Sequence, residues 1–239
     1  MNDSLQKLHK KYKVYLESDV QNVTKKGKLY SITLRKGNTA QVVKAEALLI
    51  TAGITPNSDL LKVEKTGVKI NERGYIAVNE YMETSVPGIW ALGDIVGKAP
   101  FKHGANFEAK HVFWNLRGNK KYAVDYSVMP HAIFTSPQIA GVGLTEEQAK
   151  EQGIAYEVRR GDYKTSGMGK AIEENDGFVK FIVDKKHDKI LGCHILGPEA
   201  SILIHEVIVA MAGAGGSISA IKNSIHIHPA LSEVVQRAL

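Results

Sequence analysis

The sequence predicts an α/β fold followed by an α+β domain, and three stretches carry this prediction. Residues 47–53 are apolar and end at a glycine, which is typical of a central strand covered on both faces. Residues 86–94 form a second apolar stretch that ends in Gly-Asp, at the point where strands of an open α/β sheet present groups to ligands. Beyond Tyr126, strand-like and helix-like patterns alternate. We expect this last part to fold independently, as a sheet with helices on one face.

The first 125 residues contain further short elements. Alternating and β-branched side chains predict strands, glycine-containing lysine-rich stretches predict turns, and apolar spacing ahead of Gly118 predicts a helix. We expect strands at 14–16, 18–23 and 30–34, turns at 25–28 and 36–38, a hairpin of 67–70 with 75–78, and a helix over 106–116.

The second part has clearer signals. Thr145 suits the N-cap of a helix to about Gln152, with acidic residues in its first turn. Residues 178–183 and 190–196 are expected to be paired strands, and Ser217 to open a helix. Residues 201–212 are apolar nearly all round, which predicts a buried helix or a subunit interface.

Composition narrows the functional class. The chain has 239 residues, 44% hydrophobic and 23% charged, and a formal net charge of +6. Its lysines, including those at 7–13, form short clusters without interleaved aromatics, so we expect solvated faces and no nucleic-acid binding. No apolar run is long enough to span a membrane, and no signal peptide is evident. The single cysteine, Cys193, lies in an apolar stretch and suits a buried position in a reducing compartment. We expect a cytoplasmic protein without a metal site.

A histidine, a proline and a glutamate near the end of the chain form the most informative motif. Pro229 suits the first position of a helix, where a missing N–H costs nothing. Glu233 would then lie between one and two turns along that helix. A carboxylate there can fold back onto one imidazole nitrogen of His228 and leave the other free, as an acid/base histidine requires. The same spacing also fits a histidine that caps a helix beside a solvated glutamate.

Several segments, in this order, resemble the flavin-dependent pyridine nucleotide–disulfide oxidoreductases. Within that family the dihydrolipoamide dehydrogenases are the most similar group. Each motif is weak alone, but together they cover nearly the whole chain past residue 10. The segments are 47–57, 90–94 with 101–105, 134–143, 197–201 and 226–233.

The resemblance implies FAD and NAD as cofactors and assigns roles by position. Gly93 and Asp94 match the site where an aspartate hydrogen-bonds the ribityl chain of the flavin, and a carboxylate is a good acceptor for such hydroxyls. Gly53 matches the glycine that lets the nicotinamide cofactor come close. The family often has arginine after that glycine, whereas this chain has Ile54. The segment whose backbone approaches the flavin ring is matched by Phe101, Lys102 and His103.

The resemblance also gives the C-terminal motif a meaning. His228 and Glu233 match a catalytic pair in which the histidine exchanges protons with the dithiol substrate, at the flavin site of the partner subunit. A homodimer through residues 126–239 is therefore implied, with the apolar helix over 201–212 and the chain end as its surface. His131 and His226 have no matching role and are expected to be structural.

Some features of the family are absent from this sequence. It has no Gly-x-Gly-x-x-Gly loop after a strand, and it cannot contain the redox-active cysteine pair. The glycine-rich stretch at 213–216 follows a helix and is not such a loop. The implied domains are the C-terminal part of a nicotinamide-binding domain (1–56), the C-terminal part of an FAD-binding domain (57–125) and an interface domain (126–239), the first two being incomplete doubly wound folds.

Three interpretations fit this pattern. The chain is the C-terminal portion of a longer dihydrolipoamide dehydrogenase-like enzyme, one product of a split gene whose separate N-terminal chain supplies the rest, or a non-catalytic module that only dimerises. We favour the first, with dihydrolipoamide and NAD+ as the substrates of the parent enzyme. Glutathione, mycothiol and coenzyme A disulfides stay open as substrates, and the choice between NADH and NADPH stays open as well. We expect the chain alone to lack dehydrogenase activity and to bind flavin poorly.

Overall fold

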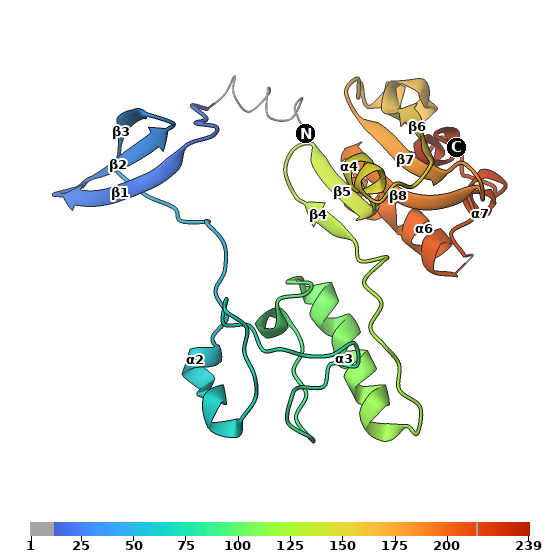
Figure 1. Ribbon diagram of the computed structural model, residues 1–239. Coiled ribbons are helices and arrows are strands. Elements are labelled where there is room, and N and C mark those ends of the chain that lie inside the picture. The colour runs from blue at the N-terminus through green and yellow to red at the C-terminus, as the bar shows by residue number, and fades with distance from the viewer. Residues whose placement is uncertain (1–11, 214) are drawn as a thin grey trace. The chain divides into compact units, whose positions relative to one another are not determined.

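The structure is a computed structural model that describes residues 12–213 and 215–239 (Figure 1). It forms two compact units, Met1–Ile54 and Thr55–Leu239, which we call the N-terminal and C-terminal units. The N-terminal lysines at 7–11 and Ala214 of the glycine-rich stretch lie outside the described residues.

The N-terminal unit contains an antiparallel three-stranded sheet. The strands are β1 (Asp19–Lys26), β2 (Leu29–Lys36) and β3 (Thr39–Ala45), in the order β1-β2-β3. Gly27 and Gly37 make the two turns with positive φ angles, as the turn prediction requires. The first two strands confirm the predictions at 18–23 and 30–34, whereas β3 was not predicted and 14–16 form no strand.

The prediction of a central strand at 47–53 is wrong for this structure. These residues belong to no strand, and Leu49 and Ile50 are 87% and 76% exposed. A central strand is covered and hydrogen-bonded by neighbours on both sides. No strand of the described part of the chain pairs with this stretch, so its apolar side chains stay in contact with solvent.

The first part of the C-terminal unit is organised around one long helix, α3 (Lys102–Arg117). This helix confirms the prediction over 106–116 and begins four residues earlier. The predicted hairpin and the predicted strand at 86–94 are each reduced to a single bridge, Ile70 with Ile76 and Glu83 with Trp90. Because no strand of residues 12–213 or 215–239 extends this pairing, the apolar side chains of 86–92 pack into small local clusters instead of a sheet. Short helical turns complete this part: α2 (Ser58–Leu61), Val63–Thr66 and Asp94–Val96.

The rest of the C-terminal unit is built on an antiparallel five-stranded sheet with the order β4-β5-β8-β7-β6. Its strands are β4 (His131–Ile133), β5 (Gln138–Gly143), β6 (Tyr156–Asp162), β7 (Phe178–Asp184) and β8 (Lys189–Gly197). Its helices are α4 (Glu146–Glu151), α5 (Gly167–Ala171), α6 (Ala200–Gly213), α7 (Ser219–Lys222) and α8 (Ser232–Arg237), with a 3₁₀ turn at Tyr163–Thr165.

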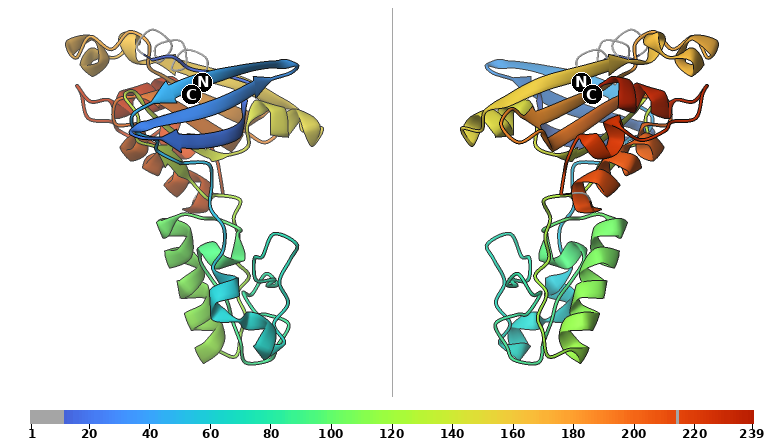
Figure 2. Two further views of the ribbon diagram at one scale, coloured as in Figure 1. Left: turned by 90° about the vertical axis from the view of Figure 1, so that its left-hand side faces the viewer. Right: turned by 90° about the vertical axis from the view of Figure 1, so that its right-hand side faces the viewer.

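One face of this sheet forms the main core. Phe181 on β7 and Cys193 on β8 are fully buried there with Val207 of α6 and Val234 of α8, and α6 runs along the sheet (Figure 2). These contacts confirm the paired strands, the buried cysteine and the apolar helix.

The prediction that all the helices lie on one face is only partly right. Lys180 is next to Phe181 on β7, so its side chain lies on the opposite face of the sheet. Its ammonium group contacts Glu146, at the start of α4, at 2.7 Å. α4 therefore begins beside the other face of the sheet, and the capping box of Thr145 and Gln148 fixes its first turn.

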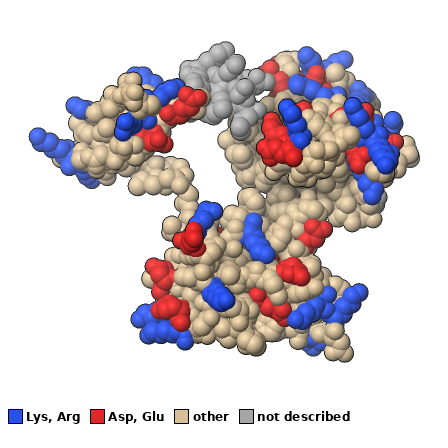
Figure 3. Space-filling model, viewed as in Figure 1, with Lys and Arg blue, Asp and Glu red and all other residues tan. Residues whose placement is uncertain are grey.

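The surface carries charges of both signs. On the face of the C-terminal unit drawn in Figure 3, lysine and arginine side chains are interspersed with aspartate and glutamate. Within residues 12–213 and 215–239, no helix has the length and apolar character needed to cross a membrane.

Candidate functional site

The C-terminal motif brings an imidazole and a carboxylate together. Nδ1 of His228 lies 3.1 Å from both Oε1 and Oε2 of Glu233. Because an ionised carboxylate only accepts hydrogen bonds, Nδ1 carries the proton and donates it, which leaves Nε2 as the free acceptor. The His228 side chain is 68% exposed, whereas that of Glu233 is 9% exposed. The Glu233 carboxylate therefore orients the ring, and Nε2 of His228 is left free on an exposed side chain.

The carboxylate of Glu233 is held by several groups. Its Oε2 accepts the backbone N–H of Ala230 at 3.1 Å, and its Oε1 accepts Nη2 of Arg237 at 3.1 Å. The hydrogen bond from His228, followed by that from Ala230, lowers the pKa of the Glu233 carboxyl below its ordinary value. Glu233 therefore stays charged near neutral pH and can stabilise an imidazolium at His228.

The helix that carries Glu233 differs from the sequence prediction. α8 begins at Ser232, so Pro229 precedes the helix and Glu233 is in its first turn. The hydrogen bond between the Ala230 N–H and the Glu233 carboxylate closes a turn before the helix, which delays its start. The predicted contact is nevertheless made, because the carboxylate folds back onto the imidazole from this position.

A glycine packs against the imidazole. A Cβ placed on Gly167, at the start of α5, would lie 3.2 Å from Cε1 of His228 and 3.6 Å from Cβ of Pro229. The backbone of α5 therefore sets one limit on the position of the ring.

The predicted flavin segment forms the N-terminus of α3. Phe101 precedes the helix and does not cap it with a side-chain hydrogen bond. The backbone N–H groups of Lys102, His103 and Gly104 have no partner among the described residues. Helix N-termini of this kind attract negative or polarised oxygen atoms. The side chains of Lys102 and His103 are used locally, in hydrogen bonds to Asn106 and to the carbonyl of Pro130.

Gly93 and Asp94 lie beside this helix. A Cβ on Gly93 would be 3.5 Å from Cβ of Ala105, and the φ angle of +81° favours glycine there. The carboxylate of Asp94 is exposed and accepts no hydrogen bond from the described residues. A free carboxylate at Asp94 and the unpaired N–H groups at the start of α3 are acceptors and donors of the kind that fit a hydroxyl-bearing, partly anionic group such as a flavin nucleotide.

A buried carboxylate that sequence reasoning missed supports this arrangement. Glu108 on α3 is fully buried, with Oε2 accepting the N–H of Gly93 at 2.5 Å and Oε1 accepting the hydroxyl of Tyr126 at 2.7 Å. Burial, followed by the bond to Glu108, raises the pKa of Tyr126 well above its ordinary value. The periodicity of α3 could have revealed this glutamate, because it shares the buried face with Val112.

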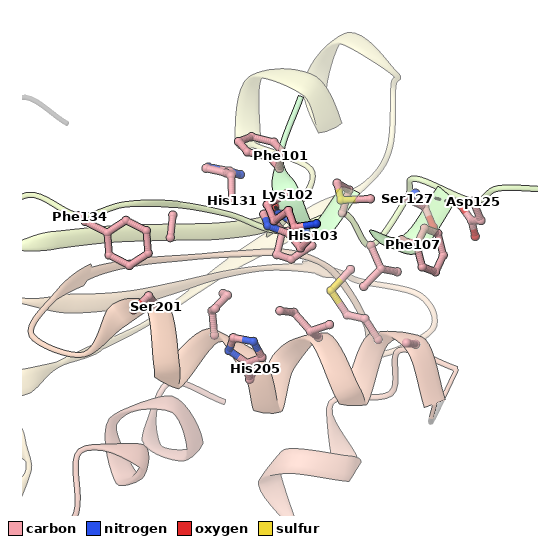
Figure 4. Close-up of a pocket in the computed structure, with 18 residues that line it drawn as sticks. Phe101, Lys102, His103, Phe107, Asp125, Ser127, His131, Phe134, Ser201 and His205 are labelled. Carbon is pink, nitrogen blue, oxygen red and sulfur yellow. Dashed lines mark hydrogen bonds between the residues drawn. The ribbon is translucent and has the colours of Figure 1, made fainter. Parts of the chain in front are cut away.

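A cavity of about 760 Å³ opens beside the predicted flavin segment. Phe101, Lys102 and His103 line it together with the 125–134 segment and residues of α6 such as Ser201 and His205 (Figure 4). Neither His228 nor Glu233 is among the described residues that line it. The predicted flavin residues and the acid/base pair thus occupy separate places in this unit.

Gly53, predicted to meet the nicotinamide cofactor, lies in the N-terminal unit. Its φ angle is +120°, which favours glycine, and a Cβ there would meet no atom within 4 Å. Its role stays a prediction.

Comparison with known families decides the relationship. Residues 1–111 match the model described as pyridine nucleotide-disulphide oxidoreductase, and residues 129–239 match the dimerisation domain of the same family. The chain belongs to the pyridine nucleotide-disulphide oxidoreductases. Members of this family use FAD and NAD(P).

The curated relatives in this family include dihydrolipoyl dehydrogenases. The chain is 35% identical over 237 residues to the mitochondrial dihydrolipoyl dehydrogenase of Pisum sativum and covers 46% of that protein. It is 36% identical to the leghemoglobin reductase of Glycine max, of which it covers 45%. It is 38% identical over 203 residues to the dihydrolipoyl dehydrogenase of Trypanosoma brucei brucei and covers 42% of it. The chain therefore spans a little under half the length of these relatives.

Solved structures of the oxidoreductases show the same fold. LpdA from Mycobacterium tuberculosis matches 98% of the chain with a TM-score of 0.89 at 23% identity, and the chain covers 51% of it. The HOCl-induced flavoprotein disulfide reductase RclA from Escherichia coli matches 97% of the chain with a TM-score of 0.83 at 27% identity, and the chain covers 53% of it. The fold class predicted from the sequence, nucleotide-binding parts followed by a dimerisation domain, agrees with these matches.

Proposed function

We propose that this chain is the acid/base and dimerisation portion of a dihydrolipoamide dehydrogenase-like oxidoreductase. The reaction is the conversion of dihydrolipoamide and NAD+ to lipoamide, NADH and a proton. One observation carries the proposal: Nδ1 of His228 is bound by the buried Glu233 carboxylate at 3.1 Å, while the rest of the ring is exposed. The similarity to dihydrolipoyl dehydrogenases supports the choice of substrate.

The chemistry of a dithiol requires such a base. A thiol with an ordinary pKa of about 8.5 is mostly protonated at neutral pH, yet the thiolate is the species that attacks a disulfide. Nε2 of His228 takes the proton from the substrate thiol and returns it when the reaction runs in the direction of lipoamide reduction. Glu233 stabilises the imidazolium formed in between and keeps Nδ1 protonated.

The cofactor residues follow from the same arrangement. Asp94 would accept hydrogen bonds from the ribityl hydroxyls of FAD, and the backbone at Phe101, Lys102 and His103 would approach the flavin ring beside Gly93. Gly53 would allow the nicotinamide cofactor, NAD, to come close. Bound FAD would supply the electron transfer between a disulfide and the nicotinamide. The redox-active cysteine pair is not among these 239 residues, whose only cysteine is the buried Cys193.

The domain assignment and the dimer are part of the proposal. Residues 1–56 belong to the nicotinamide-binding part, 57–125 to the FAD-binding part and 126–239 to the interface domain. Exposed apolar side chains on α6 and on the segment before α8, among them Ile202, Val209, Ile225 and Ile227, support a homodimer surface. Light scattering at micromolar concentration should give twice the mass of the chain, and a monomer would count against the dimer.

A chimera tests the acid/base role. The 239 residues replace the matching region of the Pisum sativum dihydrolipoyl dehydrogenase, and the oxidation of dihydrolipoamide by NAD+ is measured. We expect His228→Gln to lower kcat by about 10²–10⁴-fold, the usual contribution of a general acid/base. His187→Gln, which changes an exposed histidine on the β7–β8 turn, is the matched control and should leave kcat unchanged.

The opposite outcomes are informative. An active His228→Gln chimera would refute the acid/base assignment. The chain by itself should neither be yellow nor reduce lipoamide with NADH, and a preparation that does both would show that it needs no further residues.

A further inference from the structure

The segment that carries His228 is irregular and has few attachments. Between α7 and α8, the backbone of residues 225–228 makes no hydrogen bond with any described residue. In the single chain, Ile225 and Ile227, which the proposed dimer would cover, are fully or largely exposed. The imidazole of His226 between them is only 6% exposed. Its ring therefore turns toward the protein, and the side chains of His226 and His228 fix the segment.

The imidazole of His226 contacts one carboxylate of α6. Its Nε2 donates to Oε2 of Glu206 at 3.1 Å. Before this contact, the chain is held at Ser224, whose carbonyl accepts Nε2 of Gln236 at 2.8 Å. After it, the next attachment is the bond between His228 and Glu233. Nδ1 of His226 lies 3.4 Å from the carbonyl oxygen of Ser224, next to the same segment. Among the hydrogen bonds of the described residues, the contact between His226 and Glu206 is thus the middle of three anchors and the one that joins this segment to α6.

The glutamate of this anchor is held at a cost. Oε1 of Glu206 is buried and has no hydrogen-bond partner in the described part of the chain. Burial raises the pKa of Glu206, and the hydrogen bond from His226 opposes that effect. A buried carboxylate oxygen without a partner is unfavourable. Among the described residues, only His226 forms a hydrogen bond with this carboxylate. Any stabilisation that Glu206 gives to the fold through its carboxylate therefore depends on that one bond.

We propose that Glu206, acting through His226, is a positioning residue that sets the place and orientation of His228. Its catalytic meaning rests on the function proposed above, but the geometric claim does not. Two residues of extended chain span about 7 Å, so a free His226 would let the following residues move by several ångströms. His228 could then leave Glu233 and the limit set by Gly167, and Nδ1 would no longer be held in one protonation state.

The test uses the full chain and reads His228 directly. Long-range ¹H–¹⁵N spectra at pH 8 report which ring nitrogen is protonated, and ¹⁵N relaxation reports backbone order at 225–228. In the unaltered chain we expect the Nδ1–H tautomer to predominate at His228. The backbone order parameters of residues 225–228 should be about 0.85, the value of a rigid backbone. In Glu206→Leu we expect the tautomers to mix and the order parameters to fall below about 0.6. Glu206→Gln keeps a neutral acceptor for His226 and should restore most of both signals.

Controls separate positioning from general destabilisation. Glu151→Leu removes an exposed carboxylate from the same domain that has no partner among the described residues, and it should leave His228 unchanged. If Glu206→Leu does not fold, His226→Leu removes the same bond from the other side and is compared in the same way. A tautomer of His228 that stays as in the unaltered chain, with or without looser backbone, would overturn the proposal. A chimera that is inactive despite a predominant Nδ1–H tautomer would instead refute the proposed function.

Discussion

Glu108 should be the most costly polar side chain to replace near the predicted flavin segment. In Glu108→Leu, the N–H of Gly93 and the hydroxyl of Tyr126 both lose the carboxylate that accepts them, and only the weak acceptor Sδ of Met82, at 3.6 Å, stays beside the hydroxyl. A buried donor left without a partner costs about 1–3 kcal/mol. Gly93 is buried, whereas Tyr126 is half-buried and its hydroxyl can turn toward water. We therefore expect the free energy of unfolding to fall by about 2–4 kcal/mol.

The chain offers a local reporter for this measurement. Its two tryptophans, Trp90 and Trp114, both lie in the part of the C-terminal unit that contains Glu108. Urea unfolding followed by tryptophan fluorescence therefore reports the stability of this part. Glu72→Leu replaces an exposed glutamate of the same part and should change it by less than about 0.5 kcal/mol.

A double variant sharpens the test. Tyr126→Phe removes one of the two donors and should cost about 1 kcal/mol. Combined with Glu108→Leu, it should cost less than the two changes added, because no hydroxyl is then left without its carboxylate acceptor. The free energy of unfolding of Glu108→Leu could lie within about 0.5 kcal/mol of that of the unaltered chain, or the losses of the two single variants could simply add. Either result would show that the loss of stability does not come from buried donors without an acceptor.

Three further predictions concern the domain that carries His228. The pKa of Glu233 is lowered in the folded chain, so its stabilising contribution is present above the ordinary carboxyl value of 4.5 and is lost as the pH falls below it. Glu233→Gln should flatten that acid limb in urea midpoints measured between pH 3 and 6, and an unchanged slope would contradict this. Gly167→Ala places a methyl group 3.2 Å from Cε1 of His228. The NMR chemical shifts of the His228 ring protons should therefore change, while the midpoint of thermal unfolding moves little. Identical chemical shifts would show that the ring is not confined there. Tyr163→Phe strands the carbonyl of Pro198, which accepts the buried hydroxyl at 2.9 Å, and should lower the free energy of unfolding by about 1 kcal/mol in urea titrations monitored by circular dichroism.

The parts of the fold that could be predicted from sequence are those whose partners are nearby in the chain. β7 and β8 are joined by a short turn, and Thr145 caps α4 within its first turn, so local pattern was sufficient for both. The stretch at 47–53 has the pattern of a central strand, but a pattern cannot supply the neighbouring strands on which burial depends.

The same distinction applies to the site. The contact of His228 with Glu233 was predictable because the residues are five positions apart and a turn brings them together. The bonds of Glu108 to Gly93 and of Glu206 to His226 join residues 15 and 20 positions apart, on different elements. Nothing in the local sequence specifies these pairs, since they depend on how α3 and α6 pack. A carboxylate on an otherwise buried helical face is the one signal that could have revealed Glu108.

The burial of Cys193 in the core of the five-stranded sheet has a practical consequence. Thiol-reactive probes should not reach it while the domain is folded, and the sequence has no other cysteine. Cysteines introduced on the surface can therefore be spin-labelled selectively without first removing a native one. With one label on β1 and another on α3, electron-spin resonance would measure the distance between the two units of the chain.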